Sequence, residues 1–320
     1  MEFRRVGNSG LEVSEISLGS WLTFGSAVDV ADSAKVIEAA YELGINFFDT
    51  ADVYATGAAE EVLGRTLRAI PRHHLVIGTK CFFPMSERPN DHGLSRKHIF
   101  ESVEGSLSRL QTDYIDLHQC HRPDTDTPVA ETVRAYDDLI RAGKVLYWGV
   151  SEWSAEQIAE ACRVADDLRA PRPISNQPNY SIMRRSIEAS VLPESRRLGL
   201  GQIVFSPLAQ GVLTGKYCGG EMPEGSRATD SKHGRFMGRY LETQELARVE
   251  RLLPLADGLG ISMSQLALAW CLREPGVSSV IVGATNAEQL AENCKAAGQV
   301  LPSDVVEQID ETFAPPAAGD

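Results

Sequence analysis

Residues 46–80 read NFFDTADVYATGAAEEVLGRTLRAIPRHHLVIGTK and contain two short apolar runs with a helical pattern between them. The runs at 46–50 and 75–80 are typical of buried strands, and the helical pattern covers 58–69. Parallel strands need a crossover of this kind. The stretch therefore predicts one strand–helix–strand unit of a parallel sheet.

The same alternation continues along the chain on both sides of this unit. Further strands are predicted at 16–20, 114–120, 145–151, 173–177, 202–208 and 277–283. Further helices are predicted at 32–43, 95–110, 129–142, 154–169, 186–198, 243–259 with 264–273, and 286–297. Eight strands alternating with eight helical segments predict a (β/α)8 TIM barrel. The alternative is an open doubly wound sheet, which usually carries Gly-x-Gly-x-x-Gly after its first strand; LGSWLTFGS at 18–26 lacks that pattern.

The chain is predicted to form a single domain over residues 1–320. Its length suits one barrel with long loops at the carboxyl ends of the strands, and 43% hydrophobic residues can fill a large core. Two alternating runs around GNSG at 7–10 predict an N-terminal β-hairpin over 1–15. Residues 314–320 are expected to be a flexible tail.

Charge and cysteine content limit the partners and the compartment. Lys and Arg number 31 against 44 Asp and Glu, a net charge of −13, which disfavours nucleic acid and anionic membranes as partners. No apolar run approaches the roughly 20 residues that span a bilayer. The N-terminus lacks a secretory core, and the six cysteines are scattered, so we expect reduced thiols in a cytoplasmic protein. No zinc or metalloprotease spacing is present, and no metal site is predicted.

Four polar side chains follow three consecutive predicted strands: Asp49, Tyr54, Lys80 and His121. The carboxyl ends of barrel strands share one face, so these side chains are expected to converge. An ammonium favours phenolate, so a lysine beside Tyr54 is expected to lower the pKa of the tyrosine. A carboxylate keeps that lysine charged, and an imidazole can orient a carbonyl oxygen. The combination predicts a proton-transfer site, although each residue alone is more often structural.

His118 and His121 lie on the same predicted strand, three residues apart. Side chains alternate along a strand, so the two imidazoles are expected on opposite sides. We assign His118 a structural role.

The motifs that hold these residues resemble those of the aldo-keto reductases over nearly the whole chain. They are FFDTADVYATGAAEEVLGRTL (47–67), VIGTK (76–80), YIDLHQCHRPD (114–124), YWGVSEWS (147–154), SNQPNYS (175–181), FSPLAQGVLTGKY (205–217) and VIVGATNAEQLAEN (280–293). Their wording is most similar to the branch that includes voltage-gated potassium channel β subunits and their bacterial relatives.

The resemblance implies an NADPH-dependent oxidoreductase that reduces aldehydes or ketones to alcohols. Tyr54 would be the general acid, with Asp49, Lys80 and His121 as the other catalytic residues. His121 is the family's histidine because it directly precedes an Arg-Pro pair. The cofactor would be NADP(H), with NAD(H) possible, and the partner a small carbonyl compound.

The resemblance also implies a set of residues that bind the dinucleotide. They are Ser20, Trp21, Asp49, Ser151, Gln177, Phe205, Ser206, Pro207, Leu208, Gln210, Lys216, Arg227, Gly283, Thr285, Gln289, Glu292 and Asn293. Ser151 and Gln177 would bind the carboxamide, and Phe205 would lie against the nicotinamide ring. Many relatives have asparagine where this chain has Glu152, which implies the loss of one carboxamide contact.

The expected substrate pocket is partly apolar. Its predicted residues are Trp21, Tyr54, Phe82, His121 and Trp153, with Phe24 and Phe83 as further candidates. A homo-oligomer is possible, since this branch forms tetramers or larger rings while other reductases are monomers.

Two other functions stay open. One is a dinucleotide-binding regulatory subunit that senses redox state with little turnover; in such channel subunits an asparagine typically replaces the histidine. The other is a barrel isomerase or lyase, which would need a metal or phosphate site.

Overall fold

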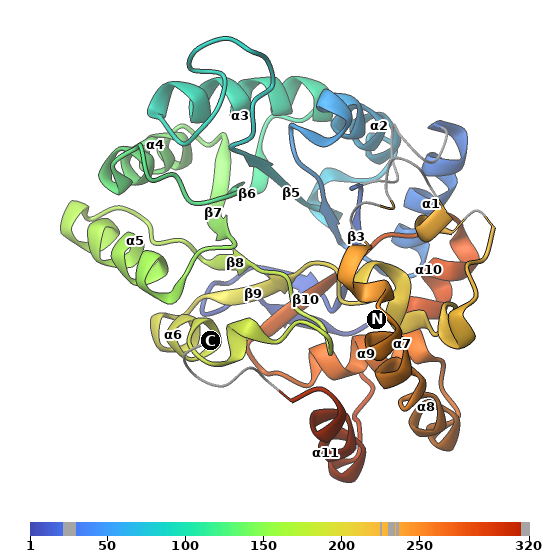
Figure 1. The fold of residues 1–320 in the computed structure, drawn as a ribbon. Coiled ribbons are helices and arrows are strands. Elements are labelled where there is room, and N and C mark those ends of the chain that lie inside the picture. Colours follow the sequence, from blue (N-terminus) through green and yellow to red (C-terminus); the bar gives the residue numbers. More distant parts are fainter. Residues whose placement is uncertain (22–29, 225, 230–233, 235–236, 315–320) are drawn as a thin grey trace.

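A closed barrel of parallel strands forms the centre of the molecule in the computed structural model (Figure 1). The structure describes residues 1–21, 30–224, 226–229, 234 and 237–314. Within these residues the barrel order is β10-β3-β4-β5-β6-β7-β8-β9, with every neighbouring pair parallel. The strands are β3 (Ile16–Gly19), β4 (Phe47–Asp49), β5 (Val76–Cys81), β6 (Ile115–Cys120), β7 (Val145–Ser151), β8 (Ser175–Gln177), β9 (Gly201–Val204) and β10 (Val277–Val282). The predicted (β/α)8 barrel is confirmed.

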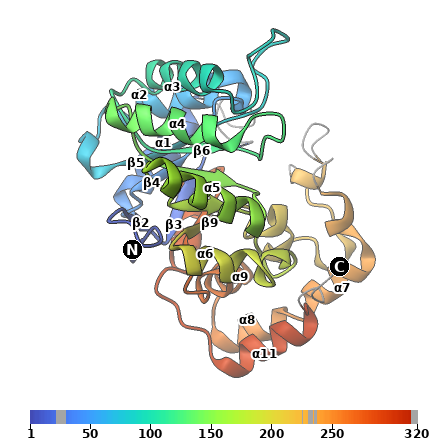
Figure 2. The same ribbon diagram turned by 90° about the vertical axis from the view of Figure 1, so that its left-hand side faces the viewer.

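Helices surround the barrel. They are α1 (Val30–Glu42), α2 (Ala58–Leu67), α3 (Arg96–Leu110), α4 (Val129–Arg141), α5 (Ala155–Leu168), α6 (Val191–Leu198), α7 (Thr243–Glu250), α8 (Leu253–Leu259), α9 (Met263–Leu272), α10 (Ala287–Cys294) and α11 (Ser303–Thr312). Figures 1 and 2 both place α8 and α11 at the bottom of the molecule, far from α2 and α3.

Two helix starts that the sequence indicates are capped by serine. Ser95 accepts a hydrogen bond from the backbone N–H of His98 at the start of α3. Ser154 and Gln157 exchange side-chain and backbone hydrogen bonds at the start of α5, which is a capping box.

Proline and left-handed backbone explain where the predicted elements end early. The strand predicted at 202–208 stops at Val204 because Ser206 has φ 54° and Pro207 has no N–H to donate. The helix predicted at 243–259 breaks into α7 and α8, and Pro254 lies in the first turn of α8. The helix predicted at 186–198 divides into a 3-10 turn (Ser186–Glu188) and α6. The sequence analysis did not predict α11.

The predicted N-terminal hairpin is present and covers one end of the barrel. Strands β1 (Phe3–Arg5) and β2 (Glu12–Ser14) pair antiparallel. Val6 and Val13 pack in one cluster with inner barrel residues that include Phe47, Leu117 and Ile203. The carboxyl ends of the strands lie at the other end of the barrel, where a site can form.

Short 3-10 turns occupy the long segment after β9. They are Ala209–Thr214, Cys218–Gly220, Arg227–Thr229 and Gly238–Leu241. Phe24 and residues 315–320 of the predicted tail lie outside the described residues. No single helix of the described part is long and apolar enough to cross a membrane. The bent helix pair Thr243–Leu259 with Met263–Leu272 has the length and apolar composition of a membrane span when its two parts are taken together.

The close approach of α2 to the end of α3 gives a stability prediction. A Cβ at Gly64 would lie 2.6 Å from the backbone oxygens of Arg109 and Leu110. We expect Gly64→Ala to destabilise the fold by about 1–3 kcal/mol, the usual range for overpacking. Gly258→Ala in α8 is the matched control: its Cβ would meet nothing within 4 Å, and alanine should stabilise that helix by about 0.5–1 kcal/mol. Urea unfolding measures both, and equal midpoints would contradict the packing described here.

Candidate active site

A buried ion pair joins Lys80 of β5 to Asp49 at the end of β4. The Lys80 Nζ lies 2.7 Å from Asp49 Oδ2 and 2.6 Å from the carbonyl oxygen of Thr50. The exposed fractions of these residues are 0% for Lys80 and 3% for Asp49. Burial by itself lowers the pKa of Lys80, but Asp49 and Tyr54 outweigh it, so the pKa is raised. Lys80 is therefore a fixed positive charge.

Tyr54 approaches this ammonium from the loop after β4. Its hydroxyl oxygen lies 3.5 Å from Lys80 Nζ, and the ammonium is 5.0 Å from the ring centroid. Burial raises the pKa of Tyr54 above its ordinary value, and Lys80 only opposes this rise. The predicted net lowering of the pKa is therefore wrong for this structure. The phenol holds its proton, as a proton donor must.

His121 contacts the ring of Tyr54. The two ring centroids are 5.6 Å apart in an edge-on arrangement. Burial, with Lys80 and Arg122 nearby, lowers the pKa of His121 well below its ordinary value. The imidazole is thus neutral near pH 7, and its buried Nδ1 has no hydrogen-bond partner among the described residues.

His118 lies on the other side of the same strand, as the alternation predicts. Its Nδ1 is 2.9 Å from the hydroxyl of Tyr136 on α4, and Tyr136 stacks on Trp148. Burial lowers the pKa of His118 to about 3. This neutral imidazole belongs to the packing between strand and helix.

Residues predicted for the nicotinamide end gather around Asp49. The side-chain amide of Gln177 donates to Asp49 Oδ1 at 2.8 Å. The Ser151 hydroxyl donates to the backbone carbonyl oxygen of Gln177 at 2.8 Å. The Ser20 hydroxyl donates to Thr50 Oγ1 at 2.8 Å. Trp21 follows Ser20 and is half-buried. The ends of β3, β4, β7 and β8 thus meet at one place.

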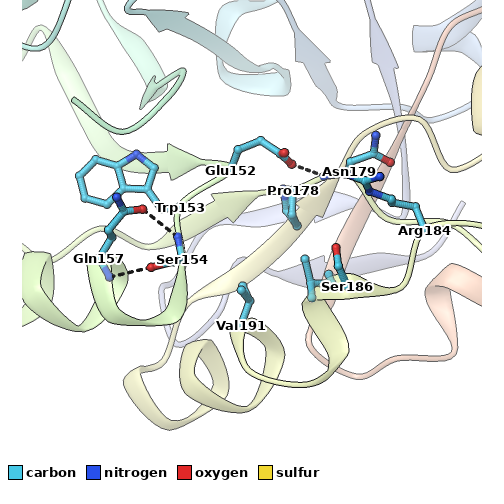
Figure 3. Close-up of a pocket in the computed structure, with 10 residues that line it drawn as sticks. Glu152, Trp153, Ser154, Gln157, Pro178, Asn179, Arg184, Ser186 and Val191 are labelled. Atoms are coloured by element: carbon cyan, nitrogen blue, oxygen red, sulfur yellow. Dashed lines mark hydrogen bonds between the residues drawn. The ribbon is translucent and has the colours of Figure 1, made fainter. Parts of the chain in front are cut away.

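The carboxylate of Glu152 is directed away from this place. Its backbone φ is 58°, and its Oε1 accepts a hydrogen bond of 2.6 Å from the backbone N–H of Asn179. Figure 3 shows the side chain reaching Asn179. Both residues line a hollow of about 240 Å3. Glu152 therefore ties the loop after β7 to the loop after β8.

The loop after β9 contains several of the residues predicted to bind the dinucleotide. Ser206, Ala209 and Gln210 have φ of 54°, 47° and 61°, and the N–H groups of Ala209 and Gly211 donate within the turn to the carbonyl oxygens of Ser206 and Leu208. The Gln210 amide donates to the Ser206 hydroxyl at 2.7 Å, and Arg227 donates to Gln210. Pro207 and Leu208 lie inside this turn, and the Lys216 side chain is beside Gly211. Ser206 and Gln210 are thus the polar side chains of this segment that could hold a pyrophosphate.

The predicted adenosine residues are contiguous around the start of α10. Gly283 directly follows β10, and Gln289 Oε1 accepts from both the N–H and the hydroxyl of Thr285, at 3.1 and 2.9 Å. Asn286 caps the helix by accepting from the Gln289 N–H. Further along α10, Glu292 accepts from Gln265 at 2.7 Å, and Asn293 is buried. The capped helix start supplies N–H groups that favour an anion.

Aromatic rings line one side of the catalytic residues. Phe83 contacts His121 at 5.0 Å and Phe82 at 5.3 Å between ring centroids, both edge-on. Phe205 is partly buried and packs on the inner barrel cluster. Trp153 is buried and instead lines the hollow of Figure 3 and a neighbouring one of about 370 Å3.

Two residues near the site are not predicted from the sequence. Arg122 is only part of the motif that identifies His121, yet its guanidinium reaches Ser151 and Phe83. Asp52 lies two residues before Tyr54 with an exposed fraction of 0%. Its Oδ2 accepts from the Ser102 hydroxyl at 2.7 Å, and its Oδ1 has no partner among the described residues. The only sequence signal for Asp52 is its place in the loop between β4 and Tyr54.

Tyrosine, lysine, aspartate and histidine side chains thus meet at the carboxyl end of a closed parallel barrel. This arrangement is that of a proton-transfer site. The chain belongs to the aldo/keto reductase family, whose model matches residues 15–313. Members of this family generally bind NAD(P)H.

Three curated proteins are similar over almost their whole length. The chain is 46% identical over 315 residues to a "probable voltage-gated potassium channel subunit beta" of Oryza sativa subsp. japonica, covering 97% of this chain and 96% of that protein. It is 45% identical over 318 residues to one of the same description in Arabidopsis thaliana, covering 98% and 97%. A "putative voltage-gated potassium channel subunit beta" of Schizosaccharomyces pombe is 43% identical over 319 residues, covering 97% and 92%. The predicted family and branch are confirmed.

The buried carboxyl of Asp52 gives a pH prediction. Burial raises its pKa from 3.8 to about 7. Between these values the folded state binds a proton that the unfolded chain has lost, so this contribution to stability is present below about pH 4 and is lost as the pH rises through about 7. We expect Asp52→Asn to gain stability relative to the unmodified chain as the pH rises across this window, by at most about 1.4 kcal/mol per pH unit. Urea unfolding at half-unit steps of pH measures the difference, and a constant difference would contradict a buried, protonated Asp52.

Proposed function

We propose that this protein is an NADPH-dependent oxidoreductase that reduces aldehydes or ketones to alcohols. One observation carries the proposal: the Tyr54 hydroxyl lies 3.5 Å from an ammonium that Asp49 holds in place, with the neutral His121 against the tyrosine ring. The dinucleotide, when bound, supplies the hydride. The turn after β9, with Ser206 and Gln210, and the capped start of α10 would hold its phosphates and its adenosine end.

The side chains supply the proton and stabilise charge. Negative charge develops on the carbonyl oxygen as the carbonyl carbon is reduced, and Tyr54 donates its hydroxyl proton to that oxygen. The remaining phenolate is stabilised by Lys80, which Asp49 keeps charged, and it regains its proton from solvent. The neutral imidazole of His121 orients the carbonyl oxygen by a hydrogen bond. The product is an alcohol.

Two cations support a preference for NADPH over NADH. Lys216 and Arg227 lie on the long segment after β9, and we assign their charges to the 2′-phosphate, which NADH lacks; a hydrogen bond from Arg227 to Gln210 holds the guanidinium beside the turn after β9. Guanidinium and ammonium groups are the usual partners of a 2′-phosphate.

A second function is a regulatory subunit that binds the dinucleotide and senses redox state. The three relatives, each described as a probable or putative potassium channel β subunit, favour it. A channel and further copies of this chain would then be its partners. The histidine 5.6 Å from the Tyr54 ring favours turnover instead, because such subunits typically have asparagine there.

The role of Tyr54 gives the first functional prediction. We expect Tyr54→Phe to lower kcat for 4-nitrobenzaldehyde by about 10²- to 10⁴-fold, the usual contribution of a general acid. The affinity for NADPH should stay within about twofold, because the change leaves the phosphate and adenosine segments intact. Absorbance at ~340 nm follows turnover, and protein fluorescence follows binding of the reduced dinucleotide.

The control for this variant is Tyr114→Phe. Tyr114 lies just before β6, at the other end of that strand from His121, and its ring lies under the Arg72 guanidinium. It should retain activity. Unchanged turnover in Tyr54→Phe would remove the assigned role. If the unmodified protein binds NADPH but reduces no member of a panel of 4-nitrobenzaldehyde, methylglyoxal and diacetyl, the regulatory function is favoured.

The cofactor preference gives a separate prediction. Fluorescence titration should show tighter binding of NADPH than of NADH. The double variant Lys216→Gln with Arg227→Gln should weaken NADPH binding by about tenfold or more and NADH binding less, since charged hydrogen bonds contribute about 1.5–3 kcal/mol. Lys97→Gln, which removes an exposed ammonium paired with Glu101 on α3, is the control and should not alter the ratio. Equal affinities for the two dinucleotides in the unmodified protein would contradict the preference.

A further inference from the structure

Arg122 places a guanidinium at the mouth of the site. Its Nη1 donates to the carbonyl oxygen of His121 at 2.5 Å and lies 3.5 Å from the Ser151 hydroxyl. Its guanidinium carbon is 5.5 Å from the ring centroid of Phe83. The side chain is half-buried and lies between the predicted carboxamide site and the aromatic side of the pocket.

No carboxylate of the described residues forms an ion pair with Arg122 within 4.0 Å. Two nearby acidic residues, Asp124 and Glu152, accept hydrogen bonds from backbone N–H groups instead. Asp124 accepts from the N–H groups of Leu94 and Asp126, at 2.7 and 2.9 Å. Glu152 accepts a hydrogen bond from the N–H of Asn179 in the loop after β8 (Figure 3).

The positive charge of Arg122 acts on the reacting groups. It contributes to the lowered pKa of His121, and it opposes the rise of the pKa of Tyr54. Asp49 pairs with Lys80, so that carboxylate is not available to Arg122. A half-buried cation without a counter-charge is unfavourable, and an arriving anion relieves this.

We propose that the physiological substrate is an aldehyde or ketone that also carries a carboxylate, and that Arg122 binds that carboxylate. This inference rests on the proposed reductase function. A guanidinium matches a carboxylate with two parallel hydrogen bonds. The edge-on rings of Tyr54, His121 and Phe83 form an adjoining apolar wall for the body of the substrate.

The reaction itself is unchanged by this assignment. Hydride goes to the carbonyl carbon and the Tyr54 proton to the carbonyl oxygen, and the carboxylate stays ionised. Arg122 distinguishes between substrates and positions the carbonyl group, and the chemical step does not pass through it.

The experiment compares each isomer of carboxybenzaldehyde with its own methyl ester, using NADPH. The ortho, meta and para acids place the carboxylate at different distances from the aldehyde, and each ester is its neutral match. For the best isomer we expect kcat/KM to exceed that of the ester by about tenfold or more. Arg122→Gln should lower this acid-to-ester ratio by about 10- to 100-fold, and Arg122→Lys should restore part of it, since lysine keeps the charge without the planar fork.

Arg184→Gln is the matched control. Arg184 lines the hollow of Figure 3 outside the catalytic residues, so its loss should leave the acid-to-ester ratio unchanged. NADPH affinity, measured by fluorescence, should stay within about twofold in Arg122→Gln. Added salt should reduce the preference for the acid, because screening weakens the ion pair.

Two outcomes would overturn the assignment. One is an unmodified protein that reduces no acid better than its ester. The other is an Arg122→Gln variant that loses acid and ester activity equally while binding NADPH more weakly, which would assign Arg122 to the cofactor. Ester turnover separates these from failure of the proposed function: if neither acids nor esters are reduced, the reductase function and this inference both fall.

Discussion

The ion pair between Lys80 and Asp49 is the interaction on which the rest of the site depends. Neither residue has an alternative partner of opposite charge in the described part of the chain, and both are buried. Removing one member of such a pair leaves an uncompensated buried charge, which typically costs about 3–5 kcal/mol. Asp49 also accepts from Gln177, and Lys80 also donates to Thr50. One pair thus connects β4, β5 and β8 at the barrel mouth.

The arrangement of protons in the site follows from burial and this pair together. Burial keeps Tyr54 protonated and His121 neutral, whereas Asp49 keeps Lys80 charged. The mouth therefore contains a proton donor, a neutral hydrogen-bonding ring and a fixed cation. These groups stabilise negative charge that develops on an oxygen atom, which is the requirement of carbonyl reduction.

The barrel could be predicted from the sequence because each strand is a short apolar run and each crossover has helical periodicity. The convergence of Asp49, Tyr54, Lys80 and His121 followed from their places after consecutive strands. The ends of elements were less predictable. The turn at Ser206 depends on a left-handed backbone, and the break before α8 depends on a proline within a helical pattern.

Charge balance could not be predicted from the sequence. The spacing of Lys80 and Tyr54 suggested a lowered tyrosine pKa, but the structure shows that burial outweighs the ammonium. Glu152 is one residue from Ser151, yet its backbone directs the carboxylate to Asn179. Among the described residues Arg122 has no ion-pair partner because neighbouring carboxylates such as Glu152 are directed to other groups. The direction of a side chain is visible only in the three-dimensional contacts. The roles of the individual cofactor residues stay predictions.

The transfer of hydrogen from cofactor to substrate tests the central claim most directly. NADPH deuterated at both C4 positions is incubated with the protein and 4-nitrobenzaldehyde, and the alcohol is analysed by mass spectrometry. If Tyr54 and the dinucleotide act as proposed, the alcohol carries a single deuterium on its carbinol carbon. An alcohol without deuterium, or no alcohol from protein that binds the dinucleotide, would contradict the proposal.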